Sequence, residues 1–574
     1  MPAFRTEWDT EPNPVYDIWT AVNGSEVVPG IVSPLFATSF VHYDYEGLRR
    51  LMASYAGGHR AELFPPPVAN FFGVFGGRLA LNNGFSVAAV SALDPEIAQA
   101  ILGQFFTGAT GGERFIVDST PEEREVAYRE ATAQREAAPA VLAGYRAALF
   151  AERSSSRYER DLNLDLPAAW ERWQQLCDEN FTVLLPVHYV VSVAAGEFQV
   201  RLAGVIQAGG GDPNVMVALC SAIGEVESSK PAMALYDLAE QARADGTVRA
   251  AFEAGDLDDI ASHLEDTDGP WAAFAEAYRD FRFRYGYRGQ GEVDPTNPDW
   301  AEQPTFALSQ ERAMIDVPPE ASPRTTTAEA VARRQALEAD VRAALPDELR
   351  PVFDDVLARA QAFTRMRELS KATWVLGARR TRAAYLALGR GLAEAGVVDD
   401  ADDARFLFAD EVSTVVGGGS LPDARDRVAR RRARADEAEG YLLPDNWVGE
   451  SVPEPRGEAV DVDRLEGLGV SPGRGPVTGT ARIIPSAVAG LARDLDPGDV
   501  LVAPFTDAPW TPLFITAGAV VVETGGVLSH AATVAREFGI PAVVMVKQAT
   551  QVIKEGDEVT VDGMAGTVTI LTRA

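Results

Sequence analysis

The chain has 574 residues, 46% hydrophobic and 24% charged, which is a globular composition with room for several domains. Asp and Glu outnumber Lys and Arg by 84 to 52, and such an acidic chain repels phosphate backbones and anionic lipids, which argues against nucleic-acid or membrane-surface partners. The cysteines, Cys177 and Cys220, are too few and too far apart for a disulfide framework or a CxxC motif.

No segment of the sequence predicts a secretion or membrane signal. The first ten residues lack a basic region followed by an apolar run, which a signal peptide would show. No uninterrupted apolar stretch approaches the roughly 18–20 residues that a membrane helix needs. We therefore expect a cytoplasmic protein with no membrane partner.

The first part of the chain, residues 1–315, mixes helical runs with glycine-rich turns and predicts a mostly helical region. Its clearest predicted helices are 121–153, 168–177 and 231–244. Prolines and small polar residues predict a linker over 316–327. Residues 328–442 return to Ala, Arg, Leu and Glu at helical spacing, so we expect a helical continuation with charged, solvated faces.

The last part of the chain has a different character. Three prolines among acidic residues predict a second linker at 443–457. Beyond it, short β-branched runs alternate with glycine turns, and one helix is expected at 531–538. The expected strands are 480–484, 500–503, 519–522, 542–546, 558–561 and 567–571. Residues 458–574 therefore form a compact α/β domain, and the predicted fold class is a multidomain α plus α/β protein.

The most informative segment surrounds His530. Two glycines allow a tight turn after an apolar strand, and Ser529 is a good N-cap, which places His530 at or beside the first helical residue. The positive end of a helix dipole disfavours imidazolium, so the imidazole stays in its neutral, nucleophilic form. Once a phosphoryl group is attached, the same helix end favours the negative charge of that group. The turn therefore suits a phosphoryl-carrying histidine. A histidine that only caps the helix is the alternative.

The segment from Thr524 to Val543 resembles the phosphohistidine signature of the PEP-utilising enzymes, T-G-G-x-x-S-H-x-A-x-x-A-R-E-x-G-I-P-A-V. Residues 469–475, and residues 498–502 followed by Thr506, also resemble that family. The resemblance implies that 458–574 is a phosphohistidine swivelling domain in which His530 carries the phosphoryl group. The residues that it implies hold the imidazole or the phosphoryl group are Thr524, Gly525, Gly526, Ser529 and Arg536. A helix-surface ion pair with Glu537 or a neighbouring carboxylate is the alternative for Arg536.

The remaining chain resembles the acceptor-binding part of rifampin phosphotransferases. Residues 19–35 follow W-T-x-x-N-x-x-E-x-x-P-G-x-x-x-P-L. Residues 286–304 follow G-H-R-x-x-G-E-x-D-x-x-x-P-x-W-x-E-x-P, with Tyr287 in place of the usual histidine. Residues 367–371 match the R-E-x-x-K that lies on a helix facing the transferred phosphate. The resemblance implies a large, mostly helical acceptor-binding region ahead of the swivelling domain.

The R-E-x-x-K spacing has a physical meaning. Arg367 and Lys371 share a helix face, so they can present two cations to one phosphoryl group. Glu368 lies about 100° around the helix and can take a proton. Solvated surface charges are the alternative. His188 and three residues of the 286–304 motif are the acceptor-site candidates, and for those three the alternative is a buried ion-pair cluster: Arg288, Glu292 and Asp294. His42 and His59 have weaker claims.

The chain resembles a rifampin phosphotransferase that lacks an ATP-grasp domain. In this it is similar to the phosphohistidine subunit of two-component enzymes such as phenylphosphate synthase. The sequence has no Gly-Lys pair and no phosphate-binding loop motif, and it ends soon after the swivelling domain. We therefore expect a dikinase-type phosphotransferase subunit. A separate ATP-grasp partner would phosphorylate His530 from ATP, with Mg²⁺ mainly at that step and no metal site of its own. The acceptor would be a hydroxyl of a small, aromatic organic molecule. A phosphorelay protein and a binding protein without catalysis are the alternatives.

Overall fold

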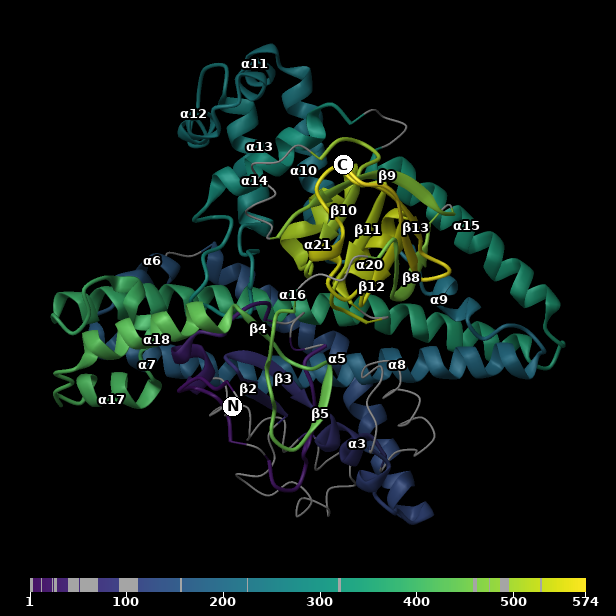
Figure 1. The fold of residues 1–574 in the computed structure, drawn as a ribbon, viewed down its shortest axis with the longest axis horizontal. Helices are drawn as coiled ribbons and strands as arrows, with labels where there is room; N and C mark the ends of the chain where they lie inside the picture. Colours follow the sequence, from purple (N-terminus) through teal and green to yellow (C-terminus); the bar gives the residue numbers. More distant parts are fainter. Residues whose placement is uncertain are drawn as a thin grey trace. The chain divides into compact units, whose positions relative to one another are not determined.

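The computed structural model describes most of the chain (Figure 1). The described residues are 4–11, 13–22, 24, 28–39, 51, 71–91, 112–154, 157–224, 226–317, 322–457, 462–473, 475–485, 495–526 and 529–574. They form two compact units that alternate along the sequence. Unit 1 comprises residues 1–197, 291–297 and 370–457, and unit 2 comprises residues 198–290, 298–369 and 458–574.

Unit 1 combines helices with a small antiparallel sheet. Its helices are α3 (Asn83–Ser91), α5 (Pro121–Arg153), α6 (Arg157–Leu162), α7 (Leu166–Glu179), α17 (Ala409–Val416) and α18 (Ala424–Ala438), with parts of α8 (Leu185–Ala208) and α16 (Arg350–Glu394). The sheet has the order β2-β3-β1-β5, with bounds β1 Ile18–Thr20, β2 Phe72–Phe75, β3 Arg78–Asn82 and β5 Asn446–Val448. Gly76 and Gly77 make the hairpin turn with positive φ angles of 53° and 76°, which suits the twist of the strands.

The small sheet is absent from the predicted elements, and it uses part of the predicted linker. Strand β5 lies within residues 443–457 and pairs with β1, so that Trp447 stands opposite Trp19. Two short strands, β4 (Tyr441–Leu442) and β6 (Glu454–Pro455), pair with each other beside it. Trp19 and Phe75 pack edge to face in the core of this sheet. These contacts tie most of residues 443–457 to unit 1.

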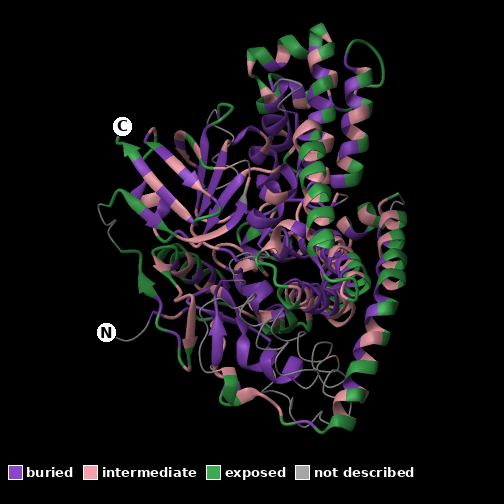
Figure 2. Cartoon of the chain, turned by 90° about the vertical axis from the view of Figure 1, so that its right-hand side faces the viewer, coloured by how far each residue is buried: buried purple, intermediate pink, exposed green. Residues whose placement is uncertain are grey.

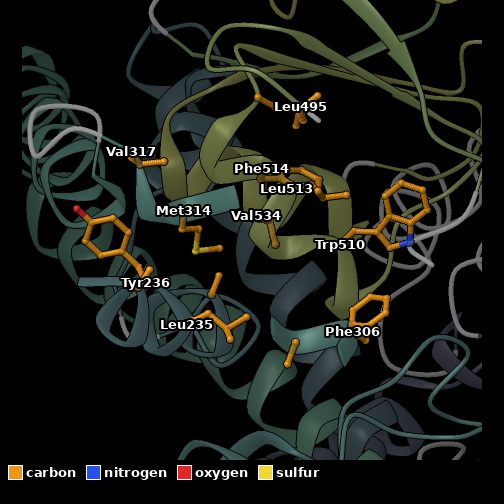
Figure 3. Close-up of a cluster of buried hydrophobic side chains, with 14 of the residues drawn as sticks. Leu235, Tyr236, Phe306, Met314, Val317, Leu495, Trp510, Leu513, Phe514 and Val534 are labelled. Carbon is orange, nitrogen blue, oxygen red and sulfur yellow. The ribbon is translucent and has the colours of Figure 1, made fainter. Parts of the chain in front are cut away.

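The helices of unit 2 surround the other core. They are α9 (Val215–Leu219), α10 (Lys230–Ala244), α11 (Gly246–Ala254), α12 (Leu257–Ser262), α13 (Ala272–Tyr285), α14 (Pro304–Ile315) and α15 (Pro323–Ala344), with the remaining parts of α8 and α16. Figure 3 shows that Leu235 of α10 and Phe306 and Met314 of α14 lie in one buried cluster with residues of the C-terminal segment, Trp510 and Phe514 among them. Burial of these apolar side chains fastens α10 and α14 to that segment.

The C-terminal part of unit 2 is built on an eight-stranded sheet of order β7-β14-β13-β9-β10-β11-β12-β8. The strands are β7 (Arg464–Glu466), β8 (Leu468–Pro472), β9 (Val477–Ile483), β10 (Val500–Ala503), β11 (Ala519–Val522), β12 (Pro541–Val544), β13 (Glu558–Asp562) and β14 (Thr567–Thr572). Strands β9 to β12 are parallel neighbours. Three short helices connect them: α19 (Thr511–Thr516), α20 (His530–Phe538) and α21 (Ala549–Val552).

The central strands of this sheet are buried on both faces, as the purple strands in Figure 2 show. Along β11, Val520 and Val522 face the cluster that contains α10, α14 and α20. Ala519 and Val521 face a second cluster closed by β13, β14 and α21. Strands covered on both faces read as continuous apolar runs, which is the pattern that predicted them.

The predicted fold class is confirmed: a mostly helical region precedes a C-terminal α/β region. The predicted helices are present as α5, α7 and α10, and the helix that follows the histidine turn is α20. All six predicted strands are present, whereas β7, β8, α19 and α21 were not predicted. Among the described residues, one apolar helical stretch, Leu166–Ala208, has the length and composition of a membrane helix, and 61% of its most apolar window is buried inside the protein, as in a core helix.

Candidate active site at His530

His530 is the first residue of α20, which follows β11 after a glycine turn. Gly525 has a φ of 113°, a conformation that side chains rarely adopt. Ser529 caps the helix, because its hydroxyl oxygen accepts a hydrogen bond of 3.1 Å from the backbone N–H of Ala532. Gly539 ends the helix in a left-handed conformation. The predicted strand–turn–helix arrangement is therefore present, with His530 at the positive end of the helix.

The imidazole of His530 is buried, with 7% of the residue exposed, and its contacts come from elsewhere in unit 2. Its Nε2 lies 3.2 Å from the hydroxyl oxygen of Thr511, the first residue of α19. The same hydroxyl lies 3.3 Å from the backbone carbonyl oxygen of Ser228, just before α10. The ring also stands edge-on to Phe514. Nε2 of His530 therefore contacts α19 through Thr511, and Thr511 in turn contacts the residue just before α10.

Three of the predicted phosphoryl-binding side chains make contacts that support the local backbone. The Thr524 hydroxyl donates to the carbonyl oxygen of Pro504 at 3.1 Å, and Ser529 caps α20. Arg536 Nε donates to the carbonyl oxygen of Val470 at 2.7 Å. Burial lowers the pKa of Arg536 to about 10, and the nearby charge of Arg367 acts in the same direction. The role of these residues toward a phosphoryl group stays a prediction.

Glu537, which was considered only as an ion-pair partner of Arg536, has a distinct environment. Its Oε1 accepts a hydrogen bond of 3.1 Å from the backbone N–H of Ile223, and the Gly224 N–H also contacts the carboxylate. Burial raises the pKa of Glu537 to about 7, and the charge of Glu368 adds to this shift, while the backbone donors oppose it. The carboxylate of α20 is therefore held by the loop that precedes α10.

That loop is also held by two arginines of neighbouring helices. Arg334 of α15 donates to the carbonyl oxygen of Ala222, and Arg365 of α16 donates to that of Ile223. Ala222 has a φ of 46°, an uncommon conformation for a residue with a side chain. The loop before α10 is thus fixed from α15, α16 and α20 together.

The predicted R-E-x-x-K residues lie on α16. Arg367 pairs with Glu368 at 2.8 Å, and both side chains are mostly buried. Their charges act on Arg536 and Glu537, so they lie near the carboxyl-terminal end of α20, whereas His530 is at its amino-terminal end. Lys371 is half-buried, and within the described part of the chain it makes no ion pair.

The acceptor-site candidates of unit 1 make contacts of their own. His188 Nδ1 lies 2.8 Å from the Ser370 hydroxyl of α16, and its ring is near Trp374. Asp294 accepts hydrogen bonds from the backbone N–H groups of Ser33 at 3.2 Å and Thr296 at 2.9 Å. Two sequence motifs, residues 19–35 and 286–304, therefore meet at Asp294.

The other two candidates of the second motif are buried. Arg288 is 3% exposed and lies over the ring of Tyr287, and Glu292 is 8% exposed. Arg288 belongs to unit 2 and Glu292 to unit 1. Their burial excludes solvated surface positions, and their role toward an acceptor stays a prediction. His42 and His59 lie outside the described residues.

Unit 1 contains a cavity of about 730 Å³. It is bordered by residues 31–34, by the acidic segment 399–406 and by one face of α18. Asp399 pairs there with Arg425, and Asp403 with Arg432. Among the described residues, no group of three or more His, Cys, Asp or Glu side chains is placed to hold a metal ion.

Sequence reasoning missed the residues that contact His530 and α20 from other elements. Thr511 follows Trp510 and precedes Pro512, and Ser229-Lys230-Pro231 opens α10, so both segments carried the signal of a helix start. That signal predicts a helix but not its neighbour. Only packing brings Thr511, Ser228 and Ile223 to α20.

Comparison with known proteins agrees with this geometry. The family model "Rifampicin phosphotransferase fourth domain" matches residues 188–368, and "PEP-utilising enzyme, mobile domain" matches residues 495–566. The chain carries the mobile domain of the PEP-utilising enzymes and resembles rifampicin phosphotransferase. The family resemblance predicted from the sequence is confirmed. The histidine turn and all of α20 lie within the matched mobile domain.

Named relatives agree as well. The chain is 32% identical to rifampicin phosphotransferase of Streptomyces sviceus over 418 residues, which cover 71% of this chain and 46% of that protein. It is 30% identical to the prodigiosin synthesizing transferase PigC of Serratia marcescens over 351 residues, covering 59% of this chain and 38% of PigC. It is 31% identical to rifampicin phosphotransferase of Bacillus subtilis over 376 residues, covering 63% and 42%. The chain spans less than half the length of these relatives.

Proposed function

We propose that this chain is a phosphotransferase in which His530 accepts a phosphoryl group and passes it to a hydroxyl of a small organic acceptor. The observation that carries the proposal is the placement of His530 at the capped amino terminus of α20, inside a segment that matches the mobile domain of PEP-utilising enzymes. The helix dipole favours the neutral, nucleophilic imidazole and then the negative charge of the phosphoryl group.

The donor in this proposal is ATP, bound with Mg²⁺ by a separate ATP-grasp partner in a dikinase-type step. These 574 residues contain no Gly-Lys pair and no G-x-x-x-x-G-K-[ST] motif, so the proposal places the donor site outside them. Mg²⁺ would neutralise the phosphates of ATP at that step. In this proposal the contribution of this chain to the donor step is the His530 imidazole, held in place by the turn and by α20.

The second half of the proposal assigns the transfer to the acceptor. Arg367 and Lys371 neutralise charge on the phosphoryl group, and Glu368 takes the proton of the acceptor hydroxyl. Lys371 supports this assignment, because it is a half-buried cation without an ion pair in the described part of a chain with a net charge of −32. His188, Arg288, Glu292 and Asp294 are proposed to border the acceptor, which we propose to be aromatic.

The direct test is transfer of label from ATP. The chain is incubated with the proposed ATP-grasp partner and with β-³²P-ATP, and acid-labile label on the chain is measured. We expect label on the wild-type chain and none on His530→Ala. His263→Ala is the control, because His263 is a half-buried histidine paired with Asp266 in a different part of unit 2. Label that persists in His530→Ala would refute the proposal.

A further inference from the structure

We propose that Thr511 and the amino-terminal turn of α10 bind the phosphoryl group carried on His530, with Ser228 and Lys230 as its ligands. This proposal rests on the phosphorylation of His530 proposed above, and it concerns residues of unit 2 that the signature does not include. It adds a phosphoryl-binding subsite formed by α19 and α10 to the histidine turn. Three observations support it.

The first observation is the contact of Thr511 with the reactive ring. Its hydroxyl oxygen lies 3.2 Å from Nε2 of His530 and 3.3 Å from the carbonyl oxygen of Ser228. A hydroxyl has one proton, so while it donates to the carbonyl its oxygen can only accept a hydrogen bond from Nε2–H. Nε2 attacks phosphorus through its lone pair once that proton has left, and the phosphoryl group then takes the place of the proton. The Thr511 hydroxyl then lies within reach of the phosphoryl oxygens and can donate to one of them.

The second observation is an unsatisfied hydroxyl at the same place. Ser228 is 4% exposed, and its Oγ has no hydrogen-bond partner among the described residues. A buried polar group without a partner is costly, so such atoms call for an explanation. Ser228 is the residue whose carbonyl oxygen the Thr511 hydroxyl contacts, and that same hydroxyl contacts Nε2 of His530. A phosphoryl oxygen would satisfy it.

The third observation is the positive charge at the start of α10. Lys230 is the first residue of this 15-residue helix, and the preceding Ser229 makes no side-chain cap, which leaves the first backbone N–H groups without a capping side chain. Lys230 pairs with buried Glu227 at 2.7 Å, and its side chain is 43% exposed. The chain has few lysines, and here one stands at a helix end that attracts anions.

The side chains that the signature predicts as phosphoryl ligands also make contacts that support the local backbone. Thr524, Ser529 and Arg536 each make a backbone contact that holds the turn or α20 in place. The Thr524 hydroxyl proton and Arg536 Nε are engaged by these contacts, so donors from other elements would add to those that the signature residues still offer. Thr511 of α19 contacts Nε2 of His530, and the same hydroxyl contacts the carbonyl oxygen of Ser228, just before α10.

The experiment phosphorylates the chain chemically, without ATP or a partner, so its failure is distinguishable from failure of the proposed function. Potassium phosphoramidate transfers its phosphoryl group to an imidazole nitrogen: the P–N bond to the amine breaks, the new P–N bond forms, and ammonia leaves with the imidazole proton. Labelling of His530 and the pKa of its phosphoryl group are followed by ³¹P NMR. His530→Ala identifies the signal.

We expect Thr511→Val and Ser228→Ala to slow labelling about tenfold, because each removes a donor to a charged group. We expect each to raise the pKa of the phosphoryl group by about one unit, because donors favour its charged form. Lys230→Met should slow labelling about threefold, since its charge is half exposed. Thr511→Ser should restore wild-type behaviour.

Matched variants separate binding from folding. Thr516→Val removes a buried hydroxyl at the other end of α19, Ser309→Ala removes a buried serine hydroxyl of α14, and Lys554→Met removes an exposed lysine. These three should label like the wild type. The pKa of the phosphoryl group decides the outcome. The proposal is overturned if Thr511→Val and Ser228→Ala leave it at the value of the controls, or if the wild-type His530 takes no label.

Discussion

The C-terminal α/β region and the helical region of unit 1 place their candidate residues in different ways. In the α/β region, Ser529, His530 and Gly539 belong to one short segment, so the cap, the candidate histidine and the end of the helix are specified locally. In unit 1, Asp294 contacts Ser33, which is 261 residues away, and His188 contacts Ser370, which is 182 residues away. A site that is built locally is readable from one motif, whereas an assembled site depends on the fold.

The largest effect is expected when His530, which its own segment positions, is replaced. His530→Gln keeps the size and polarity of the side chain but has no ring nitrogen to carry a phosphoryl group. We expect complete loss of acid-labile label and of phosphoryl transfer, with an unchanged circular dichroism spectrum. His263→Gln should retain both activities, because its ring is paired with Asp266. Retained transfer in His530→Gln would remove His530 from the reaction.

A second variant tests the residue that lies beyond the motif. Lys371→Met removes a half-buried cation. If Lys371 stabilises the transferred phosphoryl group, transfer to the acceptor should fall about 10² to 10³-fold while labelling of His530 continues. Lys554→Met is the control, because this lysine is exposed. Equal loss of labelling and transfer would place Lys371 in the first half of the reaction instead.

The pH dependence of stability tests how α20 is held by the loop before α10. Because burial raises the pKa of Glu537 from its ordinary value near 4.5 to about 7, the folded chain binds more protons than the unfolded chain between these values. Its contribution to stability is fully present below about pH 4.5 and is lost as pH rises through about 7. The loss is on the order of 3 kcal/mol.

Glu537→Gln keeps an acceptor for the Ile223 N–H and removes the charge. Its unfolding midpoint, followed by circular dichroism from pH 4 to 8, should change less with pH than that of the wild type. The exposed carboxylate variant Glu466→Gln should follow the wild type. A midpoint of Glu537→Gln that follows the wild type across this range would show that Glu537 is not the titrating group.

The smallest expected effect compares a helix cap in each region. Ser529 caps α20 in the buried core, and Thr120 caps α5 at an exposed position through a capping box. Each Ala variant should lose about 1 kcal/mol of unfolding free energy, measured by urea titration. Ser529→Ala should also slow labelling of His530, since it loosens the first turn of α20. Equal labelling of His530 in the two variants would show that the Ser529 cap does not affect phosphorylation of His530.

Much of the α/β region was predictable because its signals are short-range. Apolar runs predicted β10 and β11 with their observed bounds, and Ser529 and Gly539 predicted both ends of α20. The hairpin of unit 1 was missed, although Gly76 and Gly77 lie between two apolar runs and have the positive φ angles of such a turn. Strand β5 could not be predicted, because its partner β1 is more than 400 residues away.

The sequence by itself singled out His530 as the candidate residue, the helix that presents it and the family that its domain resembles. A capped turn of about twenty residues needs only local backbone preferences, and those are written in consecutive residues. The tertiary structure alone decided that the Thr511 hydroxyl contacts both Nε2 of His530 and the carbonyl oxygen of Ser228, and that Glu537 is held by the loop before α10. These contacts join segments up to 314 residues apart, and they arise because burial of apolar surface brings α10, α14, α19 and α20 into one core.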